Sequence, residues 1–209
     1  MKKDYTEEQY KIADNLMHSA LRRDYAVDSM IKGFFRPRKV SNPQAEKTVK
    51  QESEEIVSKL DGMTTEERFE IFDCINKLGH YHSTMSMLDN LEKGTILNHH
   101  TFMLRSAYSV YEIYYDSKVN GYLDTLEIVQ NNSEDLKKGK LDIKSSFNNL
   151  DERDKNAIVN RLKARMTEAQ ATVEKPNNFE EFKKANNDIK LFSILENITK
   201  REKEEEQER

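Results

Sequence analysis

Glycine and proline, the residues that most often interrupt regular structure, are scarce in this sequence. Only six Gly and three Pro are distributed over 209 residues. Because strands and tight turns depend on these residue types, their scarcity favours long helices joined by few loops. We therefore predict an all-α fold with roughly 70% helix, about twice the usual proportion.

Short capping motifs mark the beginning of several predicted helices. The segments Thr6–Gln9 and Thr64–Glu67 each fit a capping box, in which two side chains satisfy free backbone amides. Asn42 precedes Pro43, a pair typical of an N-cap followed by the first helical residue. With the helical spacing of the apolar residues, these signals predict about seven to eight helices. They span residues 6–32, 43–60, 65–79, 82–93, 96–119, 122–129, 152–173 and from 178 onward.

One predicted helix is apolar on nearly all sides. Residues 96–119 lie between Gly94 and Gly121 and are rich in tyrosine and aliphatic side chains. A helix of this kind must be surrounded by protein, so we expect it at the centre of a multi-helix bundle. Both glycines are expected to end the helix that precedes them, as are Gly33 and Gly79.

The prolines divide the sequence into four segments. Residues 1–32 form the predicted N-terminal helix, and residues 33–43 form a basic linker that contains two of the three prolines. The main helical domain is expected over 44–175. Residues 176–209 are expected to form a detachable C-terminal helix with a charged, frayed end, because the last ten residues include no apolar side chain.

Composition also indicates a cellular compartment. Cys74 is the single cysteine, which excludes an internal disulfide and suits a reducing environment. The first residues include acids where a signal peptide needs an apolar stretch, and no apolar run approaches the roughly 18 residues of a membrane span. We therefore expect a cytoplasmic protein that does not contact a membrane.

Basic residues are concentrated near the predicted linker, although the whole chain has a net charge of −4. Residues 32–50 contain six basic side chains against a single acidic one. Two arginines precede this segment, and two phenylalanines interrupt it. The pattern is typical of a segment that clamps a phosphate backbone or docks on an acidic protein surface. The candidate contact residues are Arg22, Arg23, Lys32, Phe34, Phe35, Arg36, Arg38, Lys39, Lys47 and Lys50.

The last predicted helix has an apolar face that could pair with a partner or with a second copy of the chain. It follows Pro176 and is therefore separable from the rest of the chain. The residues of this face are Phe182, Ile189, Phe192, Leu195 and Ile198.

Four histidines form a weak metal-binding hypothesis. His80 and His82 flank one end of the predicted 82–93 helix, and His99 and His100 follow the other end. A helix of this length separates the two pairs by roughly 17 Å, so they rarely converge on one ion. We predict no metal site and no cofactor.

Other reactive residues lack a catalytic arrangement in the sequence. Glu112 and Asp116 lie one helical turn apart, and we expect them to pair with Arg105 or Lys118. Cys74 has no neighbouring base in the sequence to activate its thiol. Glycine-rich phosphate loops and nucleophile elbows are also absent.

Together these patterns predict a non-enzymatic helical protein that binds another protein as an adaptor, inhibitor or regulator, or that self-associates. The alternative is a nucleic-acid-associated protein that contacts phosphates through residues 32–50. A helical enzyme or metal protein is the third hypothesis, and the sequence supports it least.

Overall fold

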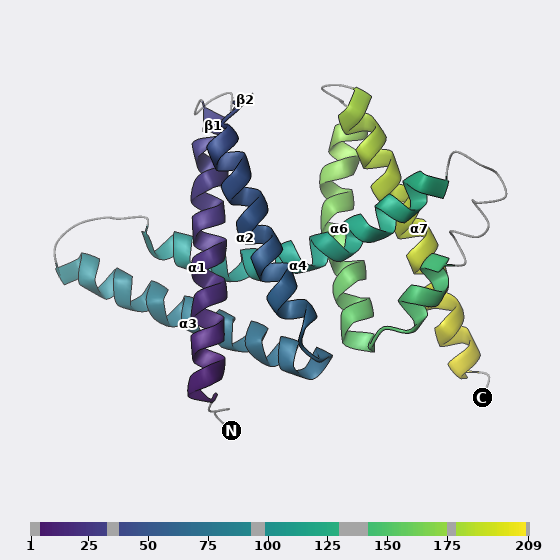
Figure 1. The fold of residues 1–209 in the computed structure, drawn as a ribbon. Coiled ribbons are helices and arrows are strands. Elements are labelled where there is room, and N and C mark those ends of the chain that lie inside the picture. The colour runs from purple at the N-terminus through teal and green to yellow at the C-terminus, as the bar shows by residue number, and fades with distance from the viewer. Residues whose placement is uncertain (1–4, 33–37, 93–98, 130–141, 175–178, 208–209) are drawn as a thin grey trace. The chain divides into compact units, whose positions relative to one another are not determined.

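The computed structural model describes residues 5–32, 38–92, 99–129, 142–174 and 179–207 (Figure 1). Within these ranges the chain is helical apart from one short two-stranded hairpin and the connections between elements. The prediction of an all-α, multi-helix fold is therefore confirmed. None of the helices in the described ranges combines the length and the apolar character that crossing a membrane requires.

The N-terminal part of the chain forms two helices joined by the hairpin. Helix α1 spans Glu7–Ser29, and helix α2 spans Pro43–Asp61. Between them, strand β1 (Ile31–Lys32) pairs antiparallel with strand β2 (Arg38–Lys39). Two-residue strands leave almost no periodic pattern, so the sequence contained no signal for this pairing.

The capping boxes are present where the sequence predicted them. At the start of α1, Gln9 donates its backbone amide to Thr6 Oγ1 at 3.1 Å, and the amide of Thr6 donates to Gln9 Oε1 at 2.9 Å. The segment Thr64–Glu67 makes the same reciprocal bonds before the third helix. Asn42 caps α2 by accepting a bond from the amide of Ala45 at 3.2 Å.

Three predicted helix ends are wrong. The N-terminal helix was predicted to reach residue 32, but α1 ends at Ser29 and Ile31–Lys32 form β1. Helix α3 spans Thr65–Glu92 and continues through Gly79, and helix α4 spans His99–Val129 and continues through Gly121. A glycine inside a helix costs only about 1 kcal/mol relative to alanine, and packing of the flanking turns outweighs this cost. The predicted helices 65–79 and 82–93 are therefore one helix, and 122–129 continues the helix before it. Gly33 and Gly94 lie outside the described residues.

The C-terminal part contains two long helices. Helix α6 spans Glu152–Glu174, which agrees with the prediction for 152–173, and helix α7 spans Phe179–Gln207. Residues 142–148 form a shorter helical segment before α6.

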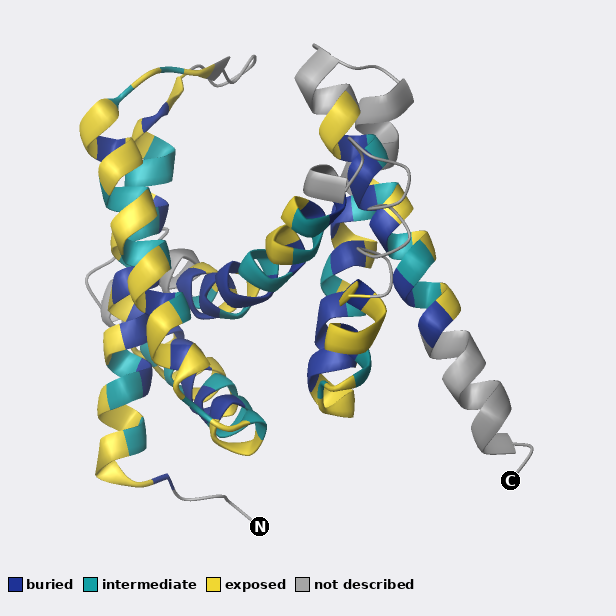
Figure 2. Ribbon diagram, turned by 45° about the vertical axis from the view of Figure 1, so that its right-hand side comes forward, coloured by how far each residue is buried: buried dark blue, intermediate teal, exposed yellow. Residues whose placement is uncertain are grey.

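The contacts divide the chain into two compact units, Met1–Tyr114 and Tyr115–Arg209, with the boundary inside α4. In the first unit α1 packs against α2 and α3. The ring of Phe72 on α3 contacts that of Tyr111 on α4, with 5.2 Å between the centroids. Buried residues alternate with exposed ones along these helices (Figure 2). The core of this unit includes Leu16, Met17, Ile56, Leu60, Ile71, Ile75, Val110 and Ile113.

The second unit has its own core. Helices α6 and α7 pack against each other, and the second half of α4 and residues 142–148 contribute further buried side chains. This core includes Tyr115, Val119, Ile143, Phe147, Ile158, Leu162, Leu191 and Leu195. Helix α4 therefore supplies buried residues to both units, but it is not surrounded on all sides as predicted, since Tyr108 is 60% exposed.

Candidate binding surface

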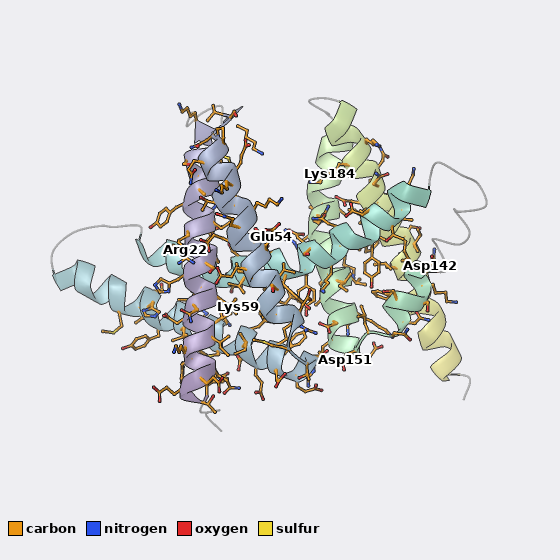
Figure 3. All side chains as sticks on the ribbon, in the orientation of Figure 1. Arg22, Glu54, Lys59, Asp142, Asp151 and Lys184 are labelled. Atoms are coloured by element: carbon orange, nitrogen blue, oxygen red, sulfur yellow. The ribbon has the colours of Figure 1, made fainter. Side chains whose placement is uncertain are left out.

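Four exposed lysines follow one another along the hairpin and the first half of α2. Lys32 lies on β1, Lys39 on β2, and Lys47 and Lys50 on α2. We call these four residues the basic surface. Among the described residues, the first three have no ion pair. Lys50 lies 3.8 Å from Glu54, but both side chains are largely exposed, so the pair contributes less than about 1 kcal/mol (Glu54 is labelled in Figure 3).

The hairpin places its side chains on two faces. Its register pairs Ile31 with Lys39 and Lys32 with Arg38, so each pair shares a face of the ribbon. The amide of Val40 donates to the carbonyl of Met30 at 2.8 Å and closes the base of the hairpin. One face of the hairpin therefore combines the aliphatic side chain of Ile31 with the cationic side chain of Lys39.

Lys47 and Lys50 are presented by the N-terminal turns of α2. The two residues are three apart, a spacing that places them on the same side of a helix. Ala45 is buried, which orients this end of α2 and leaves the lysines in solvent. Lys59, near the other end of α2, binds Glu55 at 2.8 Å, so this lysine is already paired (Lys59 is labelled in Figure 3).

Two of the four arginines in the predicted contact set, Arg22 and Arg23, lie in the contact between α1 and α2. The guanidinium of Arg22 donates to both carboxylate oxygens of Glu52, at 2.7 and 2.9 Å. This hydrogen bonding raises the pKa of Arg22 and lowers that of Glu52. Arg23 donates to Ser53 Oγ at 3.1 Å. Both arginines join the helices that support the hairpin, so we do not include them in the basic surface.

Other members of the predicted contact set lie wholly or partly outside the described residues. Phe34, Phe35 and Arg36 lie outside the described residues, and for Arg38 only the backbone pairing is described. The candidate surface therefore rests on the four lysines and on Ile31, whose side chain is 48% exposed.

The predicted apolar face of the C-terminal helix is partly covered within its own unit. Leu195 and Ile198 are buried, whereas Ile189 and Phe192 are half-buried. The side chain of Phe182 is outside the described set. Because α7 packs against α6, the buried members of this face already have an intramolecular role.

The residues considered for metal binding do not form a described cluster. His80 is exposed, and the ring of His82 contacts that of Tyr81 at 5.7 Å between centroids. The side chains of His99 and His100 are not described. Within the described part of the chain, no group of three or more His, Cys, Asp or Glu side chains could hold a metal ion.

Cys74 is a buried free thiol. Burial raises its pKa to about 11, helped by the negative charge of Asp73, so the thiolate is rare at neutral pH. Its Sγ lies 4.0 Å from the backbone carbonyl of Gln9, which agrees with a packing role.

Ion pairs between helices differ from those that the sequence predicted. Asp116 on α4 binds Arg161 on α6 through two bonds of 2.8 and 2.9 Å. Arg105, which we expected as a partner for Asp116, instead binds Asp28 on α1 with two bonds of 3.2 Å. These partners are far apart in the sequence, and no local spacing predicts them.

No protein-family model matches this chain, and searches of curated proteins and of solved structures returned no significant match. The fold therefore defines the class, an all-α multi-helix protein. Its exposed surface carries the features that bear on function.

Proposed function

We propose that this chain is a non-enzymatic, regulatory binding protein of the adaptor or inhibitor kind. Its basic surface contacts an acidic surface of another protein. The observation that supports this most directly is the exposure of Lys32, Lys39 and Lys47, which have no ion pair among the described residues. By contrast, the arginines at positions 22, 105, 161 and 165 bind carboxylates within their own unit.

The neighbouring aliphatic side chain favours a protein as the partner. Ile31 is 48% exposed and shares a face of the hairpin with Lys39. Phosphate groups gain little from an aliphatic contact, whereas protein interfaces combine apolar contact with charged rims. The net charge of −4 also repels long polyanions at a distance, so attraction by the lysines is short-ranged.

Nucleic acid is the second candidate partner. A two-stranded ribbon fits the major groove of duplex DNA, and β1 and β2 form such a ribbon with three cationic positions. Lysines bind phosphates as point charges, so binding of this kind would weaken steeply with salt.

We also propose that the protein has no catalytic role and resides in the cytoplasm. The raised pKa and the burial of Cys74 argue against a nucleophilic thiol. A single free cysteine agrees with a reducing compartment.

The test is recovery of partners by the full-length chain, with and without nuclease, from the cells that produce it. The double variant Lys39→Glu with Lys47→Glu reverses charge on the basic surface. The matched control, Lys163→Glu with Lys190→Glu, makes the same change at exposed lysines of the second unit. Circular dichroism checks that both variants remain helical.

We expect a nuclease-resistant protein that the control variant retains and the basic-surface variant loses. Recovery that disappears with nuclease would instead support the nucleic-acid candidate. Equal recovery by both variants would contradict the assignment of the basic surface as the binding site.

A further inference from the structure

The hydrogen bonds of the hairpin determine which of its backbone groups point outward. In an antiparallel pair, opposed residues that exchange both backbone hydrogen bonds alternate with opposed residues that exchange none. The amide of Val40 donates to the carbonyl of Met30, and the next pair along the hairpin is Ile31 opposite Lys39. Ile31 and Lys39 therefore share no backbone hydrogen bond, and the N–H and C=O groups of each point away from the other strand.

The outer edge of β2 is open at Lys39. Among the described residues, no group forms a hydrogen bond with the backbone N–H or C=O of Lys39. Strand β1 contacts α1, from which it continues, so β2 provides the less covered edge. The hairpin lies at the ends of α1 and α2, where a further segment can approach it (Figure 1). An unpaired strand edge of this kind is a template for one more strand.

The charge of Lys39 restricts which segment can pair with this edge. Its side chain is exposed and has no ion pair among the described residues. Directly opposed residues on neighbouring strands have their Cβ atoms about 5 Å apart, so opposite charges attract there and like charges repel. A second copy of the chain that paired symmetrically at this residue would place Lys39 opposite Lys39. The edge therefore disfavours self-pairing and favours an acidic segment.

We propose that an extended acidic segment of the partner protein adds to the outer edge of β2 as a third strand. The backbone of this segment exchanges hydrogen bonds with the N–H and C=O of Lys39, and a carboxylate lies opposite the lysine side chain. The inference rests on the proposed function, because it specifies how the basic surface holds its partner. A third strand also stabilises the hairpin, since two strands alone are only marginally stable.

The test follows hydrogen exchange of the Lys39 amide by NMR in the full-length chain. The probes are a capped hexaglutamate peptide, its fully N-methylated analogue and a short DNA duplex. The analogue keeps the charge of the peptide but has no backbone N–H to donate. At ten times its dissociation constant, hexaglutamate should slow exchange of the Lys39 amide about tenfold, whereas the other two probes should slow it far less.

A substitution separates the backbone contact from the charge. Lys39→Gln keeps the backbone groups at this position and removes the cation. We expect it to raise the dissociation constant of hexaglutamate roughly two- to fivefold, while saturating peptide still protects the amide of residue 39. Lys163→Gln, at an exposed position of α6, is the matched control and should leave the affinity unchanged.

Three results would overturn the inference. Fast exchange of the Lys39 amide at every concentration of hexaglutamate would mean that no strand adds to this edge. Equal protection by the N-methylated analogue or by the duplex would mean that charge alone holds the ligand. Equal affinity of Lys39→Gln and wild type would mean that no carboxylate faces Lys39. In each case, loss of the protein partner in the Lys39→Glu and Lys47→Glu variant would still support the proposed function, so the two failures are distinguishable.

Discussion

The phenol of Tyr115 donates a hydrogen bond of 2.7 Å to the carboxylate of Asp154, and both side chains are buried in the second unit. This bond joins α4 to the first turn of α6. Its neighbour Tyr114 donates to Asp61 at 3.1 Å in the first unit. Two consecutive tyrosines thus belong to different cores. At each position the ring packs in the core and the hydroxyl donates a hydrogen bond to a carboxylate.

We expect Tyr115→Phe to lower the free energy of unfolding by about 1–3 kcal/mol, because a buried carboxylate loses a donor. Tyr108→Phe is the control, since Tyr108 is 60% exposed and should change stability by less than about 0.5 kcal/mol. Urea denaturation followed by circular dichroism measures both. Equal stability of the two variants would show that the Tyr115 bond is not important for the second unit.

A second prediction concerns the buried pair of Arg165 and Asp188, which are 2.8 Å apart. Arg165→Met should destabilise the protein by roughly 3–5 kcal/mol, because it leaves the buried carboxylate of Asp188 without its cationic partner. Replacing both residues, with Arg165→Met and Asp188→Leu, should restore much of this loss. Thermal unfolding of the single and double variants tests this, and a double variant less stable than Arg165→Met would contradict it.

The pair of Arg22 and Glu52 predicts a dependence of stability on pH. Arg22 holds the pKa of Glu52 below its usual 4.5, so the folded state releases this proton more readily than the unfolded state. The stabilisation is complete above pH 4.5 and is lost as the pH falls through the pKa in the folded state. The difference in unfolding free energy between wild type and Glu52→Gln should therefore shrink from neutral pH to acid. A constant difference would show that the charge of Glu52 contributes little.

The contribution of Asp188 to stability should depend on pH in the opposite direction to that of Glu52. Burial raises its pKa above 3.8 and outweighs the influence of Arg165, so the folded state keeps this proton to a higher pH. Its contribution to stability therefore decreases as the pH rises from 3.8 through the pKa in the folded state. Carboxylate titration by NMR distinguishes the two residues, with Asp188 titrating above its usual value and Glu52 below.

Cys74 should react slowly with thiol reagents in the native protein. Its pKa of about 11 leaves on the order of one thiolate in a thousand at pH 8, and the side chain is buried. Labelling with Ellman's reagent should therefore be slow in buffer and complete in denaturant. Rapid labelling of the folded chain would show that the site opens readily or that the thiol is activated.

Gly121 offers a stabilising substitution. It lies inside α4, and a Cβ added there would have no heavy atom within 4 Å outside its local helix backbone. Gly121→Ala should raise the free energy of unfolding by about 0.5–1 kcal/mol, because it reduces the freedom of the unfolded chain. Denaturation midpoints test this, and a loss of stability would mean that α4 needs the flexibility of glycine at this position.

The sequence predicted those parts of the fold that depend on local signals. The capping residues Thr6, Asn42 and Thr64 fix the starts of α1, α2 and α3 through bonds within one turn, so short motifs were enough. The prediction that Gly79 and Gly121 end helices was wrong, because packing stabilises the helical turns on both sides of each glycine and outweighs its low helix propensity.

The candidate site was only partly predictable, because part of it depends on contacts between residues that are far apart in the sequence. The run of basic residues is a local pattern and was visible in the sequence. That Arg22 binds Glu52, thirty residues away, depends on how α1 and α2 pack, and this ion pair excludes Arg22 from the basic surface. The opposition of Ile31 and Lys39 likewise depends on a strand register that two-residue strands do not reveal in sequence.

Helix α4 also limits how this chain can evolve. Residues Val110 and Ile113 belong to one core, and Val119 and Leu123 to the other, yet all four lie on one uninterrupted helix. A recombination event at the boundary between the units would cut that helix and leave each product without a core element. We therefore expect that neither half folds as an independent module when the chain is divided at this boundary.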